Sequence, residues 1–471
     1  MILVPEGRDI GRKTFLSTNI PSLWDDFVPK DPKMPDLRLF FRYVIPSMIT
    51  MFIGGLYNII DSFFIGWALG AEGLAAINIT FPIFCLIFGF GDMIGTGACI
   101  LISHNRGAGD VKEENTAFSA MLGMAVILTV LITAGLLVFI EPILVFLGAD
   151  DTLLPLAKIY IVMVLAGSVF HVLAICFMAA LRNDRQPVLA MWIISTGLFF
   201  NIILDYFLVW YFPLGLFGAG LATVIAQVFP LTISVWYFAG RRTELKFLWR
   251  RCLPNREHFL AIMRNGFPSL GAHLTIGAML LFHNWQAIRY GGTAGLAAYA
   301  VICETESVAA MVMQGIASGM QPMVSFFHGA GEFVRNRRIL RYGMSLALML
   351  GVLGCLASVV GCEFFPFLLG VKGEAAEIAA RGLVISAPMF IALGMVKVGS
   401  HYFQATKNTL PASLLIHGDY AVVLPACLVF LPMILGLDGV WAAMPVSRFM
   451  LLTVMTGCWV WYGKKNRVLL N

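Results

Sequence analysis

Charged residues are scarce in this sequence. Only 13% of its 471 residues are Asp, Glu, Lys or Arg, whereas 59% are hydrophobic and the mean hydropathy is +0.84. Soluble domains average about 25% charged residues. The scarcity of charge excludes an ordinary soluble protein and predicts an all-α membrane protein that crosses the bilayer many times.

The sequence also lacks the motifs of common catalytic and metal sites. No CxxC, HExxH or P-loop pattern occurs, and the nine cysteines show no paired spacing. Five of them lie in apolar runs and are typical of small core residues, namely Cys85, Cys99, Cys176, Cys303 and Cys427. We therefore expect no disulfide, no metal site, no cofactor beyond a coupling ion, and no enzymatic activity.

The N-terminus lacks a cleavable signal. Its first 35 residues contain no continuous apolar segment and carry charges of both signs, including Arg8, Arg12 and Asp25. We predict that residues 1–37 form a cytoplasmic tail.

Twelve apolar runs are long enough to cross a bilayer, which takes about 20 residues each. They fall at 40–67, 74–102, 117–140, 155–181, 188–211, 217–239, 259–289, 295–327, 342–362, 377–404, 410–434 and 439–462. A basic stretch separates the sixth run from the seventh. The predicted domains are therefore an N-lobe (38–240), a cytoplasmic linker (241–258), a C-lobe (259–462) and a C-terminal tail (463–471).

Basic residues orient the predicted bundle. Most of the 32 Lys and Arg residues fall in the N-terminal tail, in the even-numbered connections and in the C-terminal tail. This bias places both termini in the cytoplasm of a protein in the inner (plasma) membrane. The net charge of +5 is thus a topology signal and gives no reason to expect nucleic-acid binding.

The second half of the chain repeats the first. Adding 222 to a residue number carries Pro46-Ser47 onto Pro268-Ser269 and Gly107-Ala108-Gly109 onto Gly329-Ala330-Gly331. Because each half holds an even number of spans, the two repeats enter the membrane from the same side and are parallel. Two such lobes suit alternating access better than they suit a channel, for which a filter-like loop would be expected.

Asp61 places a carboxylate inside the first apolar run, in the stretch from Tyr57 to Gly66. An ionisable side chain inside a span is costly, so it indicates a functional site. Asn58 lies three residues earlier on the same helical face and could share a polar pocket with it. The alternative is that Asp61 lies near the end of the span and is simply hydrated.

Asn201 and Asp205 are four residues apart and share one face of the fifth run. If Asp61 and Asp205 met in a low dielectric, the pair could take up and release a proton during transport. The alternative is that Asp205 is a helix-end carboxylate beside an aromatic belt at the outer interface. That belt would consist of Tyr206, Trp210 and Tyr211.

Two more polar residues of the first half belong to this set. Thr223 lies in the sixth run, and Asp92 lies in the glycine-rich stretch Gly89–Gly97 of the second. Asp92 is either a buried polar residue bonded to a neighbour or a second proton site. The candidates for proton or cation coupling are therefore Asn58, Asp61, Asp92, Asn201, Asp205 and Thr223.

The second half carries different polar residues, and His283 occupies the repeat position of Asp61. Glu304 and Glu306 are two residues apart, so they cannot both face the same side of a helix. One of them either forms a structural ion pair or attracts a cationic substrate into a central cavity. Its partner in an ion pair would be Lys397 or Arg448. The candidate cavity residues are therefore His283, Glu304 and Glu306.

The chain resembles the multidrug and toxic compound extrusion (MATE) family over about residues 38–462, most closely its DinF-type prokaryotic branch. The residues that carry the resemblance are Tyr57-Asn58-Ile59-Ile60-Asp61-Ser62, Ser103 with Gly107-Ala108-Gly109, Asn201-Ile202-Ile203-Leu204-Asp205, Gly218-Ala219-Gly220-Leu221-Ala222-Thr223, and Gln321-Pro322 with Gly329-Ala330. The resemblance implies a V-shaped pair of six-helix lobes. It also implies antiport of an organic cation against protons or sodium, with the coupling site at Asp61, Asn201, Asp205 and Thr223.

The chain departs from the family pattern at three places. After the fourth run, Arg185 stands where the family usually has Gly. The tenth run offers Lys397 and His401 in place of the carboxylate that the sodium-coupled branch uses, which favours protons. Asp92 is also unusual.

These observations predict an efflux antiporter that exports amphipathic, cationic small molecules. Its expected partners are a small organic cation and the lipid bilayer, and we expect a monomer. One alternative is a flippase of the same superfamily that moves a lipid-linked oligosaccharide. Another is a membrane-embedded enzyme that modifies lipids.

Overall fold

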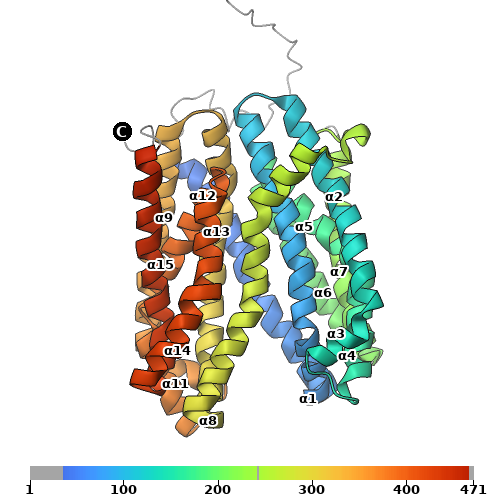
Figure 1. The fold of residues 1–471 in the computed structure, drawn as a ribbon. Coiled ribbons are helices and arrows are strands. Elements are labelled where there is room, and N and C mark those ends of the chain that lie inside the picture. The colour runs from blue at the N-terminus through green and yellow to red at the C-terminus, as the bar shows by residue number, and fades with distance from the viewer. Residues whose placement is uncertain (1–35, 241–242, 466–471) are drawn as a thin grey trace, which may run out of the picture. The chain divides into compact units, whose positions relative to one another are not determined.

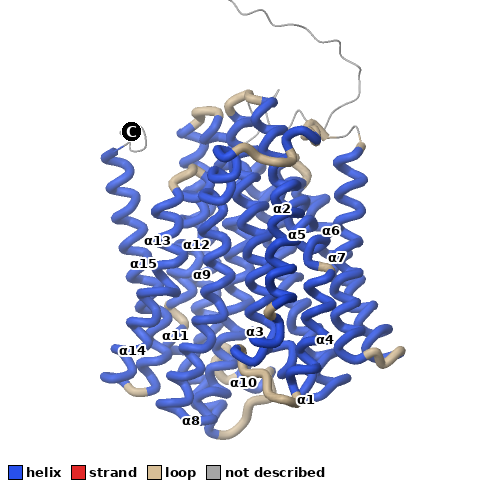
Figure 2. Tube along the Cα trace, turned by 45° about the vertical axis from the view of Figure 1, so that its right-hand side comes forward, coloured by secondary structure: helices blue, strands red, loops and turns tan. Residues whose placement is uncertain are grey.

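The predicted all-α fold is confirmed: the computed structural model shows only helices, turns and loops in the residues that it describes, 36–240 and 243–465 (Figure 1). Within these ranges, the side chains of 57–71, 74, 275, 277, 278, 281 and 462–465 are not described. The tube view shows long helices running side by side, with most loops gathered at the two ends (Figure 2). This arrangement is that of a multi-pass membrane protein.

The helices follow one another without an intervening strand in the described ranges. In chain order they are α1 (Asp36–Gly107), α2 (Val111–Val138), α3 (Ile140–Phe146), α4 (Leu153–Ala166), α5 (Ser168–Asn183), α6 (Pro187–Asp205), the π-helix η2 (Tyr206–Tyr211), α7 (Gly215–Ala239), the 3₁₀ turn η3 (Trp249–Arg251), α8 (Arg256–Gly329), α9 (Phe333–Val360), α10 (Phe364–Leu368), α11 (Glu374–Ser386), α12 (Met389–Ala405), α13 (Thr409–Gly418), the π-helix η4 (Asp419–Val423), α14 (Leu424–Leu435) and α15 (Leu437–Lys465).

Two helices are far too long for a single crossing. At 1.5 Å per residue, the 72 residues of α1 would extend about 108 Å, against a hydrocarbon core of about 30 Å. The helix α8 is interrupted at Gly292, whose φ of 59° is outside the helical region. The predicted runs 259–289 and 295–327 lie on either side of this break, which agrees with the prediction of two spans in this part of the chain.

The described residues contain nine helices that are long and apolar enough to cross a membrane, or eleven if each bent pair counts as one span. The twelfth predicted run, 259–289, includes several side chains outside the description. The other eleven predicted runs all overlap these helices.

Two of the predicted runs, 155–181 and 377–404, each consist of a bent pair of helices. The helices α4 and α5 meet at 51°, and α11 and α12 meet at 52°. At the second break, Pro388 cannot donate a backbone hydrogen bond and therefore interrupts the helix. At the first, a Cβ on Gly167 would overlap Val224 of α7, so the chain passes close to its neighbour there. The two bends occupy equivalent places in the repeat.

Each half of the chain has a hydrophobic core of its own. One cluster of buried residues draws its members from 76–262, and a second draws its members from 287–444. In Figure 1 the blue-to-green helices form one group and most of the yellow-to-red helices form the other. The exact domain boundaries stay a prediction.

The two halves meet along α1 and α8, which cross between the two groups (Figure 1). Asp36 Oδ1 lies 2.9 Å from Arg335 Nε on α9, and Glu113 Oε2 on α2 lies 2.7 Å from His258 Nε2 on α8. Adding 222 carries Asp36 onto His258 and Glu113 onto Arg335. The two ion pairs are therefore repeat equivalents with acid and base exchanged, which shows that the interface follows the repeat symmetry.

Four glycines let the backbones of α1 and α8 touch, and we call them the glycine seam: Gly97, Gly107, Gly266 and Gly329. A Cβ on Gly107 would overlap the carbonyl oxygen of Phe326, and a Cβ on Gly329 would overlap that of His104. These contacts are repeat equivalents of each other. Only glycine permits so close an approach of two helices.

The seam makes a testable prediction. The Gly329→Ala variant should be destabilised by about 1–3 kcal/mol, because its methyl group must push the two halves apart. Thermal unfolding of the detergent-solubilised protein measures the effect. The control is Gly135→Ala on α2, where a Cβ meets nothing within 4 Å. Equal melting temperatures for the two variants would show that the seam is not closely packed.

Two residues other than glycine adopt left-handed backbone conformations at repeat-equivalent turns. Arg185 has φ 65° and Lys407 has φ 62°. A side chain in this conformation costs about 1–2 kcal/mol relative to glycine, so the geometry favours glycine at both positions.

At Lys407 the cost can be isolated by comparing two truncations. Lys407→Gly should be more stable than Lys407→Ala by about 1 kcal/mol, because both lose the side chain but only glycine relaxes the turn. Chemical denaturation of the two variants measures the difference. At Arg341, an exposed position inside α9, the same pair should show the opposite order, with glycine about 1 kcal/mol worse. The same order at both sites would contradict the strain at Lys407.

Candidate functional site

Asn201 and Asp205 form a buried polar pair in the first half of the chain. Both lie on α6, and their exposed fractions are 2% and 1%. The helix does not stop at Asp205 but continues into η2, and it packs against α1. Asp205 is thus a buried carboxylate at the junction of α6 and η2, and the alternative of a carboxylate beside an aromatic belt at the outer interface stays open.

The amide of Asn201 has no hydrogen-bond partner among the described residues. A buried amide without a partner costs several kcal/mol of transfer free energy, so buried amides nearly always bond to protein, water or an ion. Asp61 and Asn58 lie on α1 in the stretch whose side chains are outside the description. Their contact with Asp205 and Asn201 therefore stays a prediction.

A π-helix begins directly after Asp205, and a second one begins at Asp419. Such widened turns leave some backbone groups out of the regular hydrogen-bond ladder, and they are frequent at functional sites. Each of the two lies beside a carboxylate that is at least 97% buried. The signal in the sequence is weak, because no residue pattern marks a π-helix.

Thr223 lies on α7, where its Oγ1 donates a hydrogen bond of 3.1 Å to the carbonyl oxygen of Ala219. The side chain is half-buried, and α7 packs against α6. The hydroxyl is thus satisfied by its own helix and keeps its acceptor lone pairs for a neighbour or an ion.

Asp92 has a partner that sequence reasoning missed. Its Oδ1 accepts a 3.0 Å hydrogen bond from Thr96, and its Oδ2 lies 3.4 Å from His273 Nε2 on α8. The side chains of Asp92 and His273 are 33% and 28% exposed. The pair joins the two halves of the chain. No spacing in the sequence links residues that are 181 positions apart.

Arg448 on α15 is the centre of a buried ionic cluster in the second half. It forms ion pairs with Glu306, at 3.3 Å, and with Asp419. Its guanidinium also lies over the ring of Tyr420, 5.0 Å from the centroid. All three charged side chains are at least 90% buried. Of the two alternatives for the glutamates, the structure shows the ion pair for Glu306, with Arg448 as its partner.

The other glutamate, Glu304, is exposed, as expected for two residues that cannot face the same side. His283 is fully buried, and its ring stacks on Tyr299 at 4.9 Å. Its Nδ1 lies 3.2 Å from the carbonyl oxygen of Met279 in the preceding turn. A role of these residues in holding substrate stays a prediction.

A short polar chain lies between α8 and α12. Lys397 Nζ donates to Gln314 Oε1 at 3.3 Å, and Gln314 Nε2 lies 3.0 Å from His401 Nε2. Both side chains of α12 occupy the tenth predicted run, where the sodium-coupled branch would carry a carboxylate. Within the described residues, no group of three or more His, Cys, Asp or Glu side chains is arranged to hold a metal ion.

The turn after α5 is tied to three other helix ends. Arg106 on α1 lies 2.6 Å from Glu114 on α2 and 3.2 Å from Asp184, to which Tyr237 of α7 donates a hydrogen bond of 2.9 Å. Burial raises the pKa of the Asp184 carboxyl, and the charge of Arg106 partly opposes this. The motif around Arg185 therefore fastens the first half together at this end.

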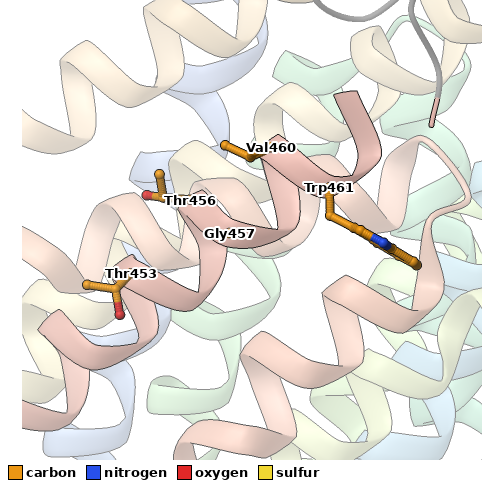
Figure 3. Close-up of a pocket in the computed structure, with 5 residues that line it drawn as sticks. All are labelled: Thr453, Thr456, Gly457, Val460 and Trp461. Atoms are coloured by element: carbon orange, nitrogen blue, oxygen red, sulfur yellow. The ribbon is translucent and has the colours of Figure 1, made fainter. Parts of the chain in front are cut away.

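A surface depression on α15 is lined by Thr453, Thr456, Gly457, Val460 and Trp461 (Figure 3). All five belong to one helix, so they cannot enclose a ligand. The two hydroxyls donate to the carbonyl oxygens of Met450 and Leu452 in their own helix. The depression is therefore not a candidate for the transport site.

Comparison with known proteins agrees with this architecture. The MatE family model matches residues 46–207 and again residues 268–427. The two matches begin 222 residues apart, which is the offset of the internal repeat.

Related proteins match along almost the whole chain. Multidrug export protein MepA of Staphylococcus aureus (strain MSSA476) is 24% identical over 432 residues, which are 90% of this chain and 93% of that protein. The protein of the same name from Staphylococcus saprophyticus is 23% identical over 422 residues, covering 88% and 91%.

Solved structures share the fold. A Vibrio cholerae MATE transporter, VcmN, superimposes with a TM-score of 0.87 at 21% identity, covering 93% of this chain and 99% of that one. A transporter of the MOP superfamily from Pyrococcus furiosus gives 0.86 at 22% identity, covering 93% and 97%. Since the family model covers both halves, the chain belongs to the MatE family, the multidrug and toxic compound extrusion transporters that its motifs resemble.

Proposed function

We propose that this protein is a secondary active efflux transporter that exports amphipathic, cationic small molecules in exchange for protons. The observation that carries the proposal is the buried pair Asn201 and Asp205 on α6, which packs against the helix that bears Asp61. Asp205 is 1% exposed, and burying a carboxylate in a membrane span is costly. Such a residue therefore indicates a functional site. Curated relatives that cover most of the chain are named multidrug export proteins, which supports transport over an enzymatic role.

Coupling requires that the two ligands prefer different states of the protein. Protonation of Asp61 and Asp205 would neutralise the site, change the packing of α1 against α6 and weaken substrate binding on the outward side. A ligand can shift a conformational equilibrium only by as much as its affinity differs between the two states. The substrate must therefore be bound more tightly by the deprotonated, inward-open lobe.

The second half of the chain supports protons over sodium. Its two buried carboxylates, Glu306 and Asp419, are both paired with Arg448. A sodium ion placed there would face the repulsion of the guanidinium at close range. Because Arg448 is taken up by this cluster, the half-buried Lys397 remains as the cation of the tenth predicted run, which is a thin basis for the pyrophosphate site of a flippase.

The test is transport of ethidium in proteoliposomes under an imposed pH gradient and, separately, under a sodium gradient. We expect dye movement driven by the pH gradient and no response to sodium. Sodium-driven transport would overturn proton coupling. Absence of any cation transport would favour the flippase alternative, and turnover of a lipid without a gradient would favour an enzyme.

The orientation belongs to the same proposal. We place the C-terminal ends of α1 and α8 on the cytoplasmic side of the plasma membrane, and we expect both chain termini on the same side. We also expect the protein to be a monomer. The excess of basic residues in the connections at this end supports the assignment. Val111 is exposed at that end, so a cysteine introduced there tests the assignment. We expect a membrane-impermeant reagent to react with this cysteine in inside-out vesicles and not in right-side-out vesicles.

A further inference from the structure

The ion pair between Asp92 and His273 joins the two halves within their membrane-spanning segments. Asp92 lies in the candidate span Ala75–Gly107 of α1, and His273 lies in the predicted run 259–289 of α8. The ion pairs of Asp36 with Arg335 and Arg338, and of Glu113 with His258, also join the halves, but they lie near helix starts at one end of the bundle. The distance between Asp92 and His273 therefore depends on the separation of the two halves in this part of the bundle.

The repeat symmetry shows that packing does not require this pair. Adding 222 carries Asp92 onto Gln314, and His273 is the equivalent of Met51. Gln314 bonds to Lys397 and His401 of its own half. One side of the interface therefore has a charged pair where the equivalent side has a methionine and an amide. The fold makes the same helix crossing with and without it.

The pair lies next to the closest contacts between the halves. A Cβ on Gly89 would be 3.2 Å from the Cβ of His273, and about two turns further on, Gly97 meets Gly266. The rest of the seam continues to Gly107 and Gly329. The lobes cannot part along this seam without also separating Asp92 from His273.

About a third of each side chain is not covered by other atoms of the protein. Several titratable or charged groups surround it. Arg182 at the end of α5 and His401 on α12 both interact electrostatically with Asp92, and Lys397 interacts with His401. His171 on α5 is connected through the ring of Phe88, which contacts both histidines. His273 is the group among them that forms an ion pair with a carboxylate of the other half.

We propose that Asp92 and His273 form a proton-binding site shared by the two halves, and that its occupancy sets how firmly the glycine seam is held closed. With a proton on both imidazole nitrogens, His273 carries a positive charge and donates to the Asp92 carboxylate. Such charge-assisted hydrogen bonds are about twice as strong as neutral ones. After the proton leaves to water, a neutral imidazole faces the Asp92 carboxylate, and the weaker hydrogen bond between them holds the seam less tightly. The inference rests on the proposed function only in that the lobes move.

The test measures the separation of the halves directly. Spin labels on non-natural amino acids at Val111 and Val334, which are 61% and 63% exposed, report it by double electron–electron resonance while all native cysteines stay in place. Raising the pH from 6 to 8.5 should increase the long-distance population of the wild-type protein about three- to tenfold. In His273→Gln and in Asp92→Asn, that population should be high at both pH values.

A matched control is His417→Gln. His417 lies on α13 beside the same α8 helix, but it stacks on Phe267 and packs on Gly271 within the second half. This variant should keep the wild-type response. The exchange Asp92→His with His273→Asp should restore it.

A wild-type distance that does not change with pH would overturn the proposal, as would a normal response in His273→Gln. Because His273→Gln and Asp92→Asn are independent variants, misfolding of either one, checked by size-exclusion profile, leaves the other decisive. The measurement needs no substrate. A pH-dependent distance without dye transport would therefore refute the proposed efflux function and leave the shared proton site standing.

Discussion

Asp205→Asn is expected to lower proton-driven ethidium export strongly while leaving the protein folded. The asparagine keeps the size of the side chain and its buried contacts on α6, but it cannot gain or lose a proton. Coupling free energies between two ligands are about 1–3 kcal/mol, so transport against the gradient should fall about 5- to 150-fold. Initial rates in proteoliposomes under an imposed pH gradient measure the loss, and Asp61→Asn should behave in the same way.

The matched control for this experiment is Asp151→Asn, which changes an exposed carboxylate in the turn before α4. Its rate should equal that of the wild-type protein. Equilibrium binding of the dye separates the two roles of Asp205. If the carboxylate couples protons, the variant should still bind ethidium, and the binding should lose its dependence on pH. Full proton-driven transport by Asp205→Asn would remove the first half of the chain from the coupling mechanism.

Arg448→Met is expected to destabilise the protein strongly. It would leave the carboxylates of Glu306 and Asp419 buried without their common partner. Removing one partner of a buried ionic cluster costs about 3–5 kcal/mol, because the remaining charges are no longer compensated. A large drop in melting temperature on thermal unfolding in detergent is the measurable result.

Two comparisons make the result specific. In the triple variant with Arg448→Met, Glu306→Gln and Asp419→Asn, no charge is left uncompensated, so much of the lost stability should return. The ion pair between Arg381 and Asp438 is solvent-exposed, with 70% of the arginine side chain accessible. Because such pairs contribute about 0–1 kcal/mol, Arg381→Met should be nearly neutral. Equal effects of Arg448→Met and Arg381→Met would show that the cluster is hydrated.

Several features were predictable because they are recorded locally along the chain. Apolar length fixed the spans, and the break of α8 at Gly292 fell between the two predicted runs 259–289 and 295–327. The offset of 222 residues returned in the family matches, in the exchanged pairs Asp36–Arg335 and His258–Glu113, and in the left-handed turns at Arg185 and Lys407. A repeat can be recognised in the sequence because corresponding residues of the two halves are separated by a constant number of positions.

The candidate site was predictable only in part. Asn201 and Asp205 stood out because a polar pair at helical spacing is unusual in an apolar run, and their burial agrees with that interpretation. The structural ion pair of Glu306 was one of two open alternatives, and its choice of Arg448 over Lys397 depended on the packing of α15 against α8. The bends at Gly167 and Pro388 were not predicted, because a hydropathy pattern gives the length of an apolar run but not the direction of the helix axis.

By itself, the sequence determined that this protein is a helical membrane protein with two parallel repeats and a few costly polar residues inside its spans. Hydrophobic length, basic flanks and internal similarity are properties of neighbouring residues or of a constant offset, so they need no knowledge of packing. Only the tertiary structure decided which polar groups meet. The pairing of Asp92 with His273 and of Asp419 with Arg448 depends on where two helices cross, and that position is set by the combined packing of many side chains and close glycine contacts.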